Sequence, residues 1–336
     1  MRELWKVLFP VDLRPMSALV PSPLRPGDTI AIVPTARAIT TDELRDGIAL
    51  AEGWGLKVKV GAGVGRKHFQ QAGTAQERAA DLQAALDDPA VRAIWCARGG
   101  YGTVHLLDHL DLAVLRRDPK WIVGFSDATV LHSALHGLGV ASLHAQMPFH
   151  IAAKTEACRD SLRRALMADE HALATNAWVS HRSTDPLALL NRAGRGEGVL
   201  VGGNLSLLHA LRGTPYDLDP QGKILFLEDL DELLYHLDRM VQNLRLAGWF
   251  KGLSGLIVGG MNDMRDKDPN DPFGRTAERI IADALGDTDY PVCFGFPAGH
   301  IADNRALVLG RAAQLHVTSE GATLRYPSIG RAAPLA

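Results

Sequence analysis

The sequence predicts an α/β fold of two domains, the first organised around a parallel β-sheet. In the first half, short apolar strands alternate with helical stretches, a pattern typical of a parallel sheet covered by helices on both faces. The strands are continuously apolar, as in TIAIV at 29–33, which suits burial on both faces. Polar or glycine-rich turns follow several strands, and functional groups of parallel sheets gather at those carboxyl ends.

Composition limits the class of protein and of partner. The 336 residues are 46% hydrophobic and 22% charged, which is typical of a globular protein of about two domains. A net charge of −2 without a long basic run argues against nucleic acid as a partner. Three cysteines do not suggest a disulfide framework, which favours a reducing, cytoplasmic compartment. No stretch resembles a signal peptide or approaches the roughly 20 apolar residues of a membrane span, so no membrane association is expected.

The first half begins with a predicted N-terminal extension, residues 1–25, ahead of the strand at 29–33. A helix predicted over 41–54 has Thr40 as its N-cap, and Glu43 completes a capping box. The same alternation predicts strands at 56–60, 93–97, 121–125 and 140–143, and helices at 74–87, 103–107 and 128–136. Parallel strands end at one edge of a sheet, so we expect the turns at 34–35, 98–102 and 126–127 to lie side by side.

The second half has longer polar connections. A linking helix and a polar connection are predicted over 154–176. The elements predicted beyond it are strands at 199–204, 224–227, 256–260 and 292–296, helices at 233–247 and 272–285, and a terminal hairpin over 307–323. The predicted domain limits are 26–155 for the first domain, 156–195 for a linker and 196–336 for the second domain.

Ser126 lies at the corner between a predicted strand and the helix that follows. Such a corner can lift a nucleophile out of the sheet and direct backbone amides at an oxyanion. The run Gly124-Phe125-Ser126-Asp127-Ala128 lacks the final glycine of the G-x-S-x-G pattern. Taken alone it favours a helix cap, because serine and aspartate are common capping residues.

A serine nucleophile needs a base, and the base needs an orienting group. His300, in a loop after a short strand, is the first candidate base, with a loop-stabilising role as the alternative. His144, just past the fifth strand, is the rival base. Glu228 directly follows a buried strand, where an unpaired carboxylate is costly. It begins an acidic cluster that can orient a histidine, bind a hard cation or start the next helix.

Two other motifs carry open alternatives. The turn at 98–102 (RGGYG) matches neither a P-loop nor the G-x-G-x-x-G pattern. Its amides could serve an oxyanion or a phosphate, and a plain tight turn is the simpler interpretation. The histidine pairs His105/His109 and His132/His136 have metal-ligand spacing but no HExxH pattern, so we expect them on solvated helix faces.

Taken together, these motifs resemble one family, the serine LD-carboxypeptidases that trim the muramoyl tetrapeptide of bacterial cell walls, a group that includes the microcin immunity peptidases. The resemblance keeps the family's order and spacing from about residue 28 to 325. The matching runs are ARGGYG (97–102), IVGFSD (122–127), GGNLSLLHALRGTPY (202–216), ILFLEDLDELLYHLDRMVQNL (224–244), LIVGG (256–260) and GFPAGHIADNRALVLG (295–310).

The resemblance implies a catalytic triad of Ser126 as nucleophile, His300 as general base and Glu228 as the acid that orients it. It also implies an oxyanion hole formed by the backbone amides of Gly100 and Asp127. The bond implied joins the L-centre of a diamino acid to a terminal D-Ala. No metal or other cofactor is implied.

Substrate contacts are less specified by the sequence. Tyr101, Asn204 and Arg98 lie in the matching runs and are candidate contacts. A carboxypeptidase must recognise a free carboxylate, and a guanidinium pairs with one through two hydrogen bonds. Arg98, Arg239 and Arg305 are the arginines considered for this clamp.

The implied architecture is a flavodoxin-like N-terminal domain and a smaller mixed α/β C-terminal domain, with the site between them. The implied partner is a small muropeptide as substrate. Whether the protein forms a homodimer is left open by the sequence. The run His144-Ala145-Gln146 departs from the family's usual His-Gly-Pro, which bears on the shape of the pocket.

Two alternative functions remain: a related peptidase that acts on a peptidyl-nucleotide antibiotic, and a non-catalytic binder of small ligands. Residues 191–198 contain no aromatic side chain to stack on a base, which favours the wall substrate.

Overall fold

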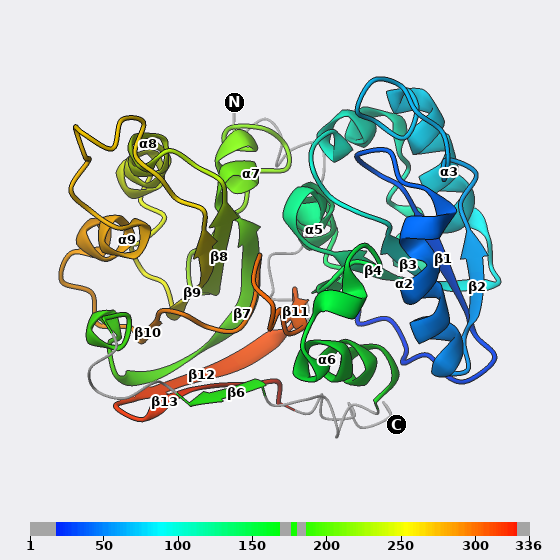
Figure 1. Ribbon diagram of the computed structural model, residues 1–336. Coiled ribbons are helices and arrows are strands. Elements are labelled where there is room, and N and C mark those ends of the chain that lie inside the picture. The colour runs from blue at the N-terminus through cyan, green and yellow to red at the C-terminus, as the bar shows by residue number, and fades with distance from the viewer. Residues whose placement is uncertain (1–17, 169–175, 180–185, 328–336) are drawn as a thin grey trace, which may run out of the picture.

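The computed structural model describes residues 18–168, 176–179 and 186–327. Two α/β domains lie side by side, each built on its own sheet (Figure 1). The first sheet is mainly parallel with helices on its faces, and the second is mixed, so the expected fold class is confirmed. No helix in these ranges is long and apolar enough to cross a membrane.

The N-terminal sheet has the strand order β11-β5-β4-β3-β1-β2. The five strands β1 to β5 are parallel to one another and lie in the flavodoxin-like order 2-1-3-4-5. Their bounds agree with the expected strands to within about three residues: β1 Thr29–Val33, β2 Lys57–Val60, β3 Val91–Cys96, β4 Trp121–Gly124 and β5 Ser142–His144.

The helices of this half follow the expected alternation. The capping box between Thr40 and Glu43 is present and starts the first of them. The stretch expected as a helix over 103–107 is a 3₁₀-helix, and a short helix near 114 was missed. The bounds are α2 Thr41–Gly53, α3 Ala75–Asp87, η1 Thr103–His109, α4 Val114–Arg117, η2 Ser126–Ala128, α5 Thr129–Gly137, η3 Ile151–Ala153 and α6 Glu156–Met167.

The C-terminal sheet has the order β10-β9-β8-β7-β12-β13-β6. The pairs from β10 to β7 are parallel, and those from β7 to β6 are antiparallel. The strands are β6 Asn176–Val179, β7 Gly194–Asn204, β8 Ile224–Leu230, β9 Gly255–Asn262, β10 Val292–Cys293, β12 Ala312–Thr318 and β13 Gly321–Arg325. The helices are η5 Ala188–Leu190, α7 Leu205–Ala210, α8 Leu234–Leu246 and α9 Ala277–Leu285.

The terminal hairpin differs from the expectation at its start. The hairpin itself is β12 with β13, whereas the apolar stretch before it, β11 (Leu307–Leu309), pairs antiparallel with β5 of the other domain. Local alternation predicted that residue 307 onwards is strand, but not which sheet the strand would join. The C-terminal part of the chain therefore supplies an edge strand to the N-terminal sheet.

An apolar core runs through the junction of the two domains. One buried cluster contains Trp95 and Trp121 from the first sheet together with Phe226 from the second and Phe296 from the loop after β10. All four side chains are at most 1% exposed. An apolar junction of this kind fixes the relative position of the sheets, so residues of both can share one site.

The expected N-terminal extension is described only from residue 18. Leu19 forms a bridge with Val140, and Leu24 is buried with its amide bonded to the carbonyl of Leu166. Residues 18–25 therefore pack along the first domain, and residues 1–17 lie outside the described part. The predicted limits of the domains and the linker remain predictions.

Candidate active site

Ser126 lies directly beyond β4, at the first residue of the short helix η2 that leads into α5. Its φ of 60° is in the left-handed region, which a residue with a side chain rarely adopts. This backbone forms a sharp strand-to-helix turn of the kind that exposes a nucleophile. Within the part of the chain that the structure describes, no side chain caps the N-terminus of η2 or α5, so the capping interpretation of Ser126 and Asp127 is wrong.

The side chain of Asp127 instead holds the glycine-rich turn. It is fully buried, and its Oδ2 accepts a hydrogen bond of 2.8 Å from the backbone of Thr103. Burial raises the pKa of this carboxyl, and the hydrogen bonds it accepts oppose that rise. From the other side, Arg78 donates to the carbonyl of Gly102 at 2.9 Å. The turn at 98–102 is therefore fixed against the Ser126 corner.

The glycines of this turn pack against the serine. A Cβ atom on Gly99 would lie 3.2 Å from the Oγ atom of Ser126, so this close approach leaves little room for a side chain. Gly100 has a φ of 115°, which favours glycine. The glycine turn thus lies against the hydroxyl, where an oxyanion hole built from its amides would have to lie. The assignment of the Gly100 and Asp127 amides to that hole remains a prediction.

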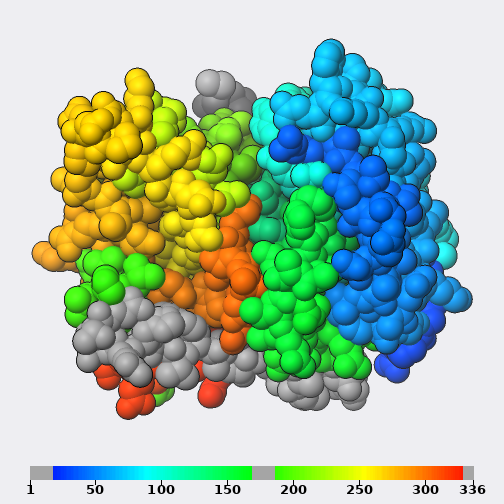
Figure 2. Space-filling view, viewed as in Figure 1, coloured from blue at the N-terminus to red at the C-terminus, as the bar shows by residue number. Residues whose placement is uncertain are grey.

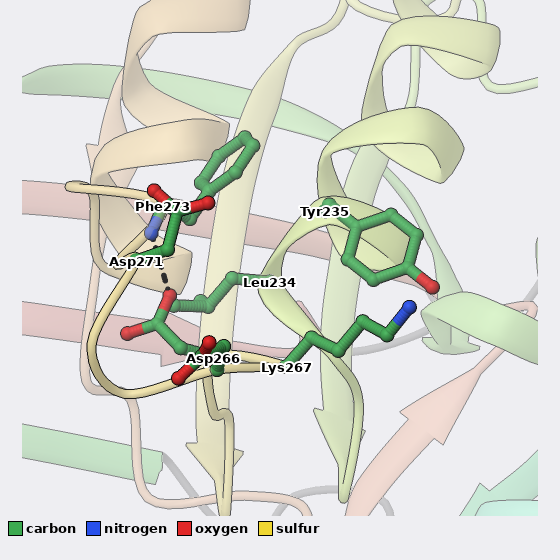
Figure 3. A pocket seen from close by; sticks show the side chains of 7 residues that line it. Leu234, Tyr235, Asp266, Lys267, Asp271 and Phe273 are labelled. Atoms are coloured by element: carbon green, nitrogen blue, oxygen red, sulfur yellow. Dashed lines mark hydrogen bonds between the residues drawn. The ribbon is translucent and has the colours of Figure 1, made fainter.

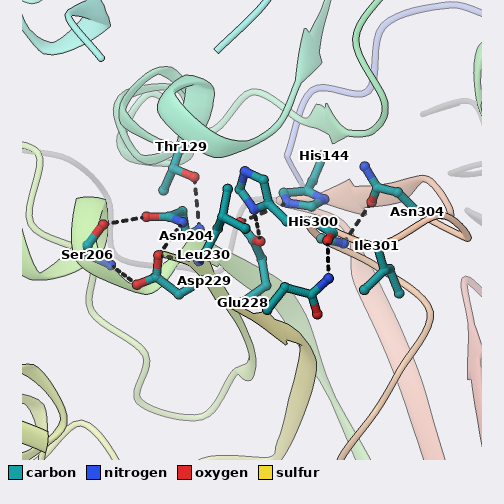
Figure 4. A network of polar contacts seen from close by, with 12 residues as sticks. Thr129, His144, Asn204, Ser206, Glu228, Asp229, Leu230, His300, Ile301 and Asn304 are labelled. Carbon is teal, nitrogen blue, oxygen red and sulfur yellow. Dashed lines mark hydrogen bonds and ion pairs between the residues drawn. The ribbon is translucent and has the colours of Figure 1, made fainter. Parts of the chain in front are cut away.

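His300 and Glu228 meet through a hydrogen bond of 2.6 Å between Nδ1 and Oε2 (Figure 4). Glu228 lies within β8 and is fully buried, whereas 14% of the His300 side chain is exposed. A Cβ on Gly299 would lie 2.8 Å from Glu228, so glycine there allows the loop to approach the acid. The ring of His300 lies 4.8 Å from that of Phe125, the neighbour of Ser126 in the chain. The structure therefore brings the predicted base and acid together beside the corner.

His300 and Glu228 shift each other's pKa. Burial alone would raise the pKa of Glu228, but the charge and hydrogen bond of His300 outweigh it and lower this pKa. Burial alone would lower the pKa of His300, but Glu228 outweighs it and raises this pKa. The carboxylate fixes the proton on Nδ1, which leaves Nε2 available for a proton from a hydroxyl.

His144, the rival base, lies on the other side of the same carboxylate. Its Nε2 is 4.0 Å from Oε1 of Glu228, longer than a hydrogen bond. The ring is fully buried, with the rings of Phe226 and Phe125 at 4.8 and 5.8 Å. Within the described ranges neither ring nitrogen has a hydrogen-bond partner. His300, which is partly exposed and bonded to Glu228, fits the role of base better.

The loop that carries His300 is held by side chains that the sequence analysis missed. Asn304 is buried, and its Oδ1 accepts a hydrogen bond of 2.8 Å from the Gly299 amide. Lys154, just before α6, donates to the carbonyl of Ile301 at 2.8 Å. Figure 2 shows the green surface of α6 against the orange surface of the segment around residue 300. No local pattern marks these contacts, because they depend on how distant segments pack.

A second polar network joins the two halves of the site. Asp229 accepts hydrogen bonds from Asn204 Nδ2 at 2.8 Å and from the Ser206 amide at 3.0 Å (Figure 4). The Asn204 amide donates to Thr129 Oγ1, on α5, at 3.0 Å. Burial first, and then the charge of Glu228, raise the pKa of Asp229 to about 7. The side-chain amide of Asn204 is engaged with Asp229, and its role as a substrate contact remains a prediction.

The acidic cluster is divided among different partners. Glu228 binds His300, Asp229 binds Asn204, and Asp231 pairs with Arg265. Among the described residues no group of three or more histidine, cysteine or acidic side chains is arranged to hold a metal ion.

A surface hollow lies between the start of α8 and the loop after β9. It is lined by Tyr235, Lys267 and Phe273 together with several aspartates (Figure 3). One of these, Asp266, accepts a hydrogen bond from the Phe273 amide at 2.7 Å and so orders the loop. The hollow contains none of the predicted triad residues.

The three arginines considered for a carboxylate clamp all have partners within the chain. Arg98 donates to the carbonyl of Ala38, lies 3.7 Å from a carboxylate oxygen of Glu43 and stacks on a phenylalanine ring. Arg305 pairs with the adjacent Asp303, and Arg239 lies over the ring of Tyr235. Tyr101, in contrast, is 54% exposed beside the glycine turn. The roles of Arg98 and Tyr101 toward substrate remain predictions.

One histidine expected on a solvated helix face is buried. His132 is 2% exposed, and its ring bonds Ser142 Oγ at 2.8 Å and the carbonyl of Gly124 at 2.9 Å. Burial lowers its pKa to about 3, so the ring is neutral. The expectation for His132 was therefore wrong: the spacing of the pair did not reveal that α5 is buried between the two domains.

Both halves of the chain are similar to known proteins. A model of the LD-carboxypeptidase N-terminal domain matches residues 30–145, and one of the LD-carboxypeptidase C-terminal domain matches residues 197–315. A probable murein peptide carboxypeptidase of Bacillus subtilis is 31% identical over 90% of this chain and 93% of its own length. A murein tetrapeptide carboxypeptidase of Pseudomonas aeruginosa is 32% identical over 88% of this chain and 94% of its own length. The crystal structure of a muramoyltetrapeptide carboxypeptidase from Oxalobacter formigenes is 28% identical and superposes with a TM-score of 0.77, covering 89% of this chain and 99% of that chain.

Proposed function

Because the chain belongs to the LD-carboxypeptidase family, a family of serine hydrolases, we propose that it removes terminal D-Ala from the muramoyl tetrapeptide in peptidoglycan recycling. The bond cleaved joins the L-centre of the diamino acid to D-Ala. The observation that carries the proposal is the hydrogen bond of 2.6 Å between His300 and Glu228, beside the corner of Ser126. The names of the relatives from Bacillus subtilis and Pseudomonas aeruginosa support the choice of a murein peptide.

In the first half of the reaction, Ser126 Oγ attacks the scissile carbonyl carbon while His300 Nε2 takes the hydroxyl proton. Glu228 keeps the other proton on Nδ1 and stabilises the imidazolium. Amides of the glycine turn and the corner stabilise the oxyanion, and one such donor typically contributes about 100- to 1000-fold in rate. The imidazolium then gives its proton to the D-Ala nitrogen as the carbon–nitrogen bond breaks.

In the second half, water attacks the acyl-enzyme and His300 takes a proton from it. The tetrahedral intermediate collapses, the proton returns to Ser126 Oγ, and the shortened peptide leaves with a new carboxylate. The raised pKa of His300 suits a residue that must accept and then donate a proton. The lowered pKa of Glu228 supports a carboxylate that stays ionised throughout.

The experiment is to incubate the purified protein with muramoyl tri-, tetra- and pentapeptides and to identify the products by mass spectrometry. We expect the tetrapeptide to lose one D-Ala and the tripeptide to remain unchanged. Release of D-Ala from the pentapeptide at a similar rate would contradict the specificity for the L-centre. No cleavage of any of the three would contradict the proposed function.

The alternative substrate class is a peptidyl nucleotide, as for the microcin immunity peptidases that the sequence resembles. Residues 191–198 contain no aromatic side chain to stack on a base, so this alternative has less support. The other alternative is a binder without catalysis. Covalent labelling of Ser126 by a fluorophosphonate would contradict it.

A further inference from the structure

Arg37 lies against the same glycine turn as the proposed nucleophile. It follows β1, and its side chain crosses Gly100 so closely that a Cβ atom there would collide with Cδ and Cγ of Arg37. The adjacent Gly99 faces Ser126, because a Cβ on Gly99 would lie 3.2 Å from the serine Oγ. Two neighbouring glycines therefore separate the hydroxyl from the stem of an arginine.

The order of the strands sets the distance between these two groups. β4, which leads to Ser126, pairs with β3, and β3 pairs with β1, which leads to Arg37. Adjacent strands are about 4.8 Å apart, so the ends of β4 and β1 are about 10 Å apart. A terminal amino acid places its carboxylate only one residue beyond the scissile carbonyl. An arginine side chain is long and flexible, so a guanidinium carried at the end of β1 is suited to reach a carboxylate at that place.

Arg37 differs from the other cations near the site in having no partner. Among the described residues its guanidinium forms no hydrogen bond or ion pair, and the side chain is exposed. Arg98 is held by Ala38 and Glu43, and Lys154 is bonded to a backbone carbonyl of the His300 loop. Of the cationic side chains described at this turn, Arg37 is thus the one whose charge is available to an anionic ligand.

We propose that Arg37 binds the terminal carboxylate of the substrate and so makes the protein a carboxypeptidase rather than an endopeptidase. The inference rests on the proposed function and adds the residue that recognises the free end of the peptide. A guanidinium forms two parallel hydrogen bonds with a carboxylate, which fixes the D-Ala as well as attracting it. A peptide that ends in a carboxamide lacks the charge and loses this pairing.

The test compares muramoyl tetrapeptide with the same peptide ending in D-alanine amide, using the wild type and Arg37→Ala. We expect the wild type to prefer the free carboxylate. In Arg37→Ala, kcat/KM for the carboxylate should fall about 10- to 100-fold, mostly through KM, because a charge-assisted hydrogen bond is lost. The rate for the amide should change little, so the preference should nearly disappear. Arg37→Lys should keep part of the preference.

The matched control is Arg279→Ala, which removes an exposed arginine on α9 that pairs with Asp283. It should leave both substrates unaffected. Arg37 is not the clamp if Arg37→Ala cleaves the peptide with a free carboxylate as fast as the wild type does, or if kcat/KM falls equally for both peptides. In either case the proposed function stands. If the wild type cleaves neither peptide, the proposed function fails and the clamp with it.

Discussion

The two halves of the candidate site are held in different ways. On the serine side, regular structure does the positioning: strand β4, a residue at a φ of 60° and the start of a helix. On the histidine side, the loop around residue 300 has no regular structure, and its shape depends on side chains such as Asn304 and Lys154 from distant parts of the chain. The serine half therefore depends on local backbone geometry, and the histidine half depends on packing between the domains.

This difference indicates which substitutions should affect catalysis alone and which should also destabilise the fold. The side chain of Ser126 can be removed without disturbing its support, because among the described residues it caps no helix. Asn304, which supports the histidine loop, is itself buried, so its loss leaves unpaired polar groups. The predictions below test this contrast, beginning with the largest expected effect.

Ser126→Ala should abolish turnover and leave the fold intact. Loss of a serine nucleophile costs about 10⁶-fold in kcat in a serine protease. Hydrolysis of muramoyl tetrapeptide and thermal unfolding measure the two effects. Ser133→Ala, farther along α5, is the control and should retain activity. Activity of Ser126→Ala near that of the wild type would remove the nucleophile from the mechanism, and a large fall in melting temperature would remove the contrast.

Glu228→Gln should lower kcat by about 10⁴-fold, the loss typical of a triad whose orienting acid becomes an amide. The acid limb of the pH profile should also move. The wild type needs neutral His300, whose pKa is raised, so kcat/KM should fall as pH drops through a value above 6.5. Without the Glu228 charge, burial dominates and the limb should shift to lower pH. Asp231→Asn, at an exposed member of the acidic cluster, is the control. An unchanged limb would contradict the pairing.

Asn304→Ala should lower both activity and stability, because the histidine half of the site depends on packing between the domains. It leaves the Gly299 amide unpaired, and a buried polar group without a partner costs about 1–3 kcal/mol. Displacement of His300 by about 1 Å should lower kcat roughly 100-fold. Urea unfolding and steady-state kinetics measure these losses, with Asn270→Ala in the exposed loop after β9 as the control. Full activity with lowered stability would show that the loop keeps its shape without Asn304.

Asp229→Asn tests the network that joins the two halves, and its effect on catalysis should be the smallest. The pKa of Asp229 rises from 3.8 to about 7 on folding, so the native state binds a proton more tightly than the unfolded state. The wild type should therefore lose stability relative to Asp229→Asn as pH rises from about 4 to about 7, with no further change above that. Urea unfolding across this range measures the slope. A difference that does not depend on pH would contradict the raised pKa.

Much of the fold could be predicted from local pattern, and the site could be predicted only in part. The apolar run 121–124 and the helical pattern beyond it placed Ser126 at a corner, and the run 224–227 placed Glu228 at a buried strand. Neither could say that the two would be neighbours, because that depends on long-range packing. His300 was a candidate base because it lies in a loop after a short strand, but only the family resemblance favoured that role over a loop-stabilising one, since loops carry no periodicity.

The misses have the same physical origin. β11 has the local pattern of any strand, and only the unpaired edge of β5 determines where it docks. His132 has the spacing of a surface pair, and only the contact of α5 with the second domain makes it buried. Arg37 carries no motif, and the role proposed for it depends on its close approach to Gly100, which the sequence does not reveal. In each case the missing information lies in the partner and not in the segment.

The pairing of β11 with β5 has a consequence for biosynthesis. Leu309 pairs with Ser142. During synthesis, the edge of β5 therefore stays uncovered until more than 160 further residues have been translated. Until then a nascent chain exposes an open strand, the kind of edge that recruits other chains. His300 precedes β11 by only a few residues, so the catalytic base and the cover for that edge leave the ribosome almost together. A ribosome-bound fragment that ends before residue 300 should thus be both inactive and prone to aggregate.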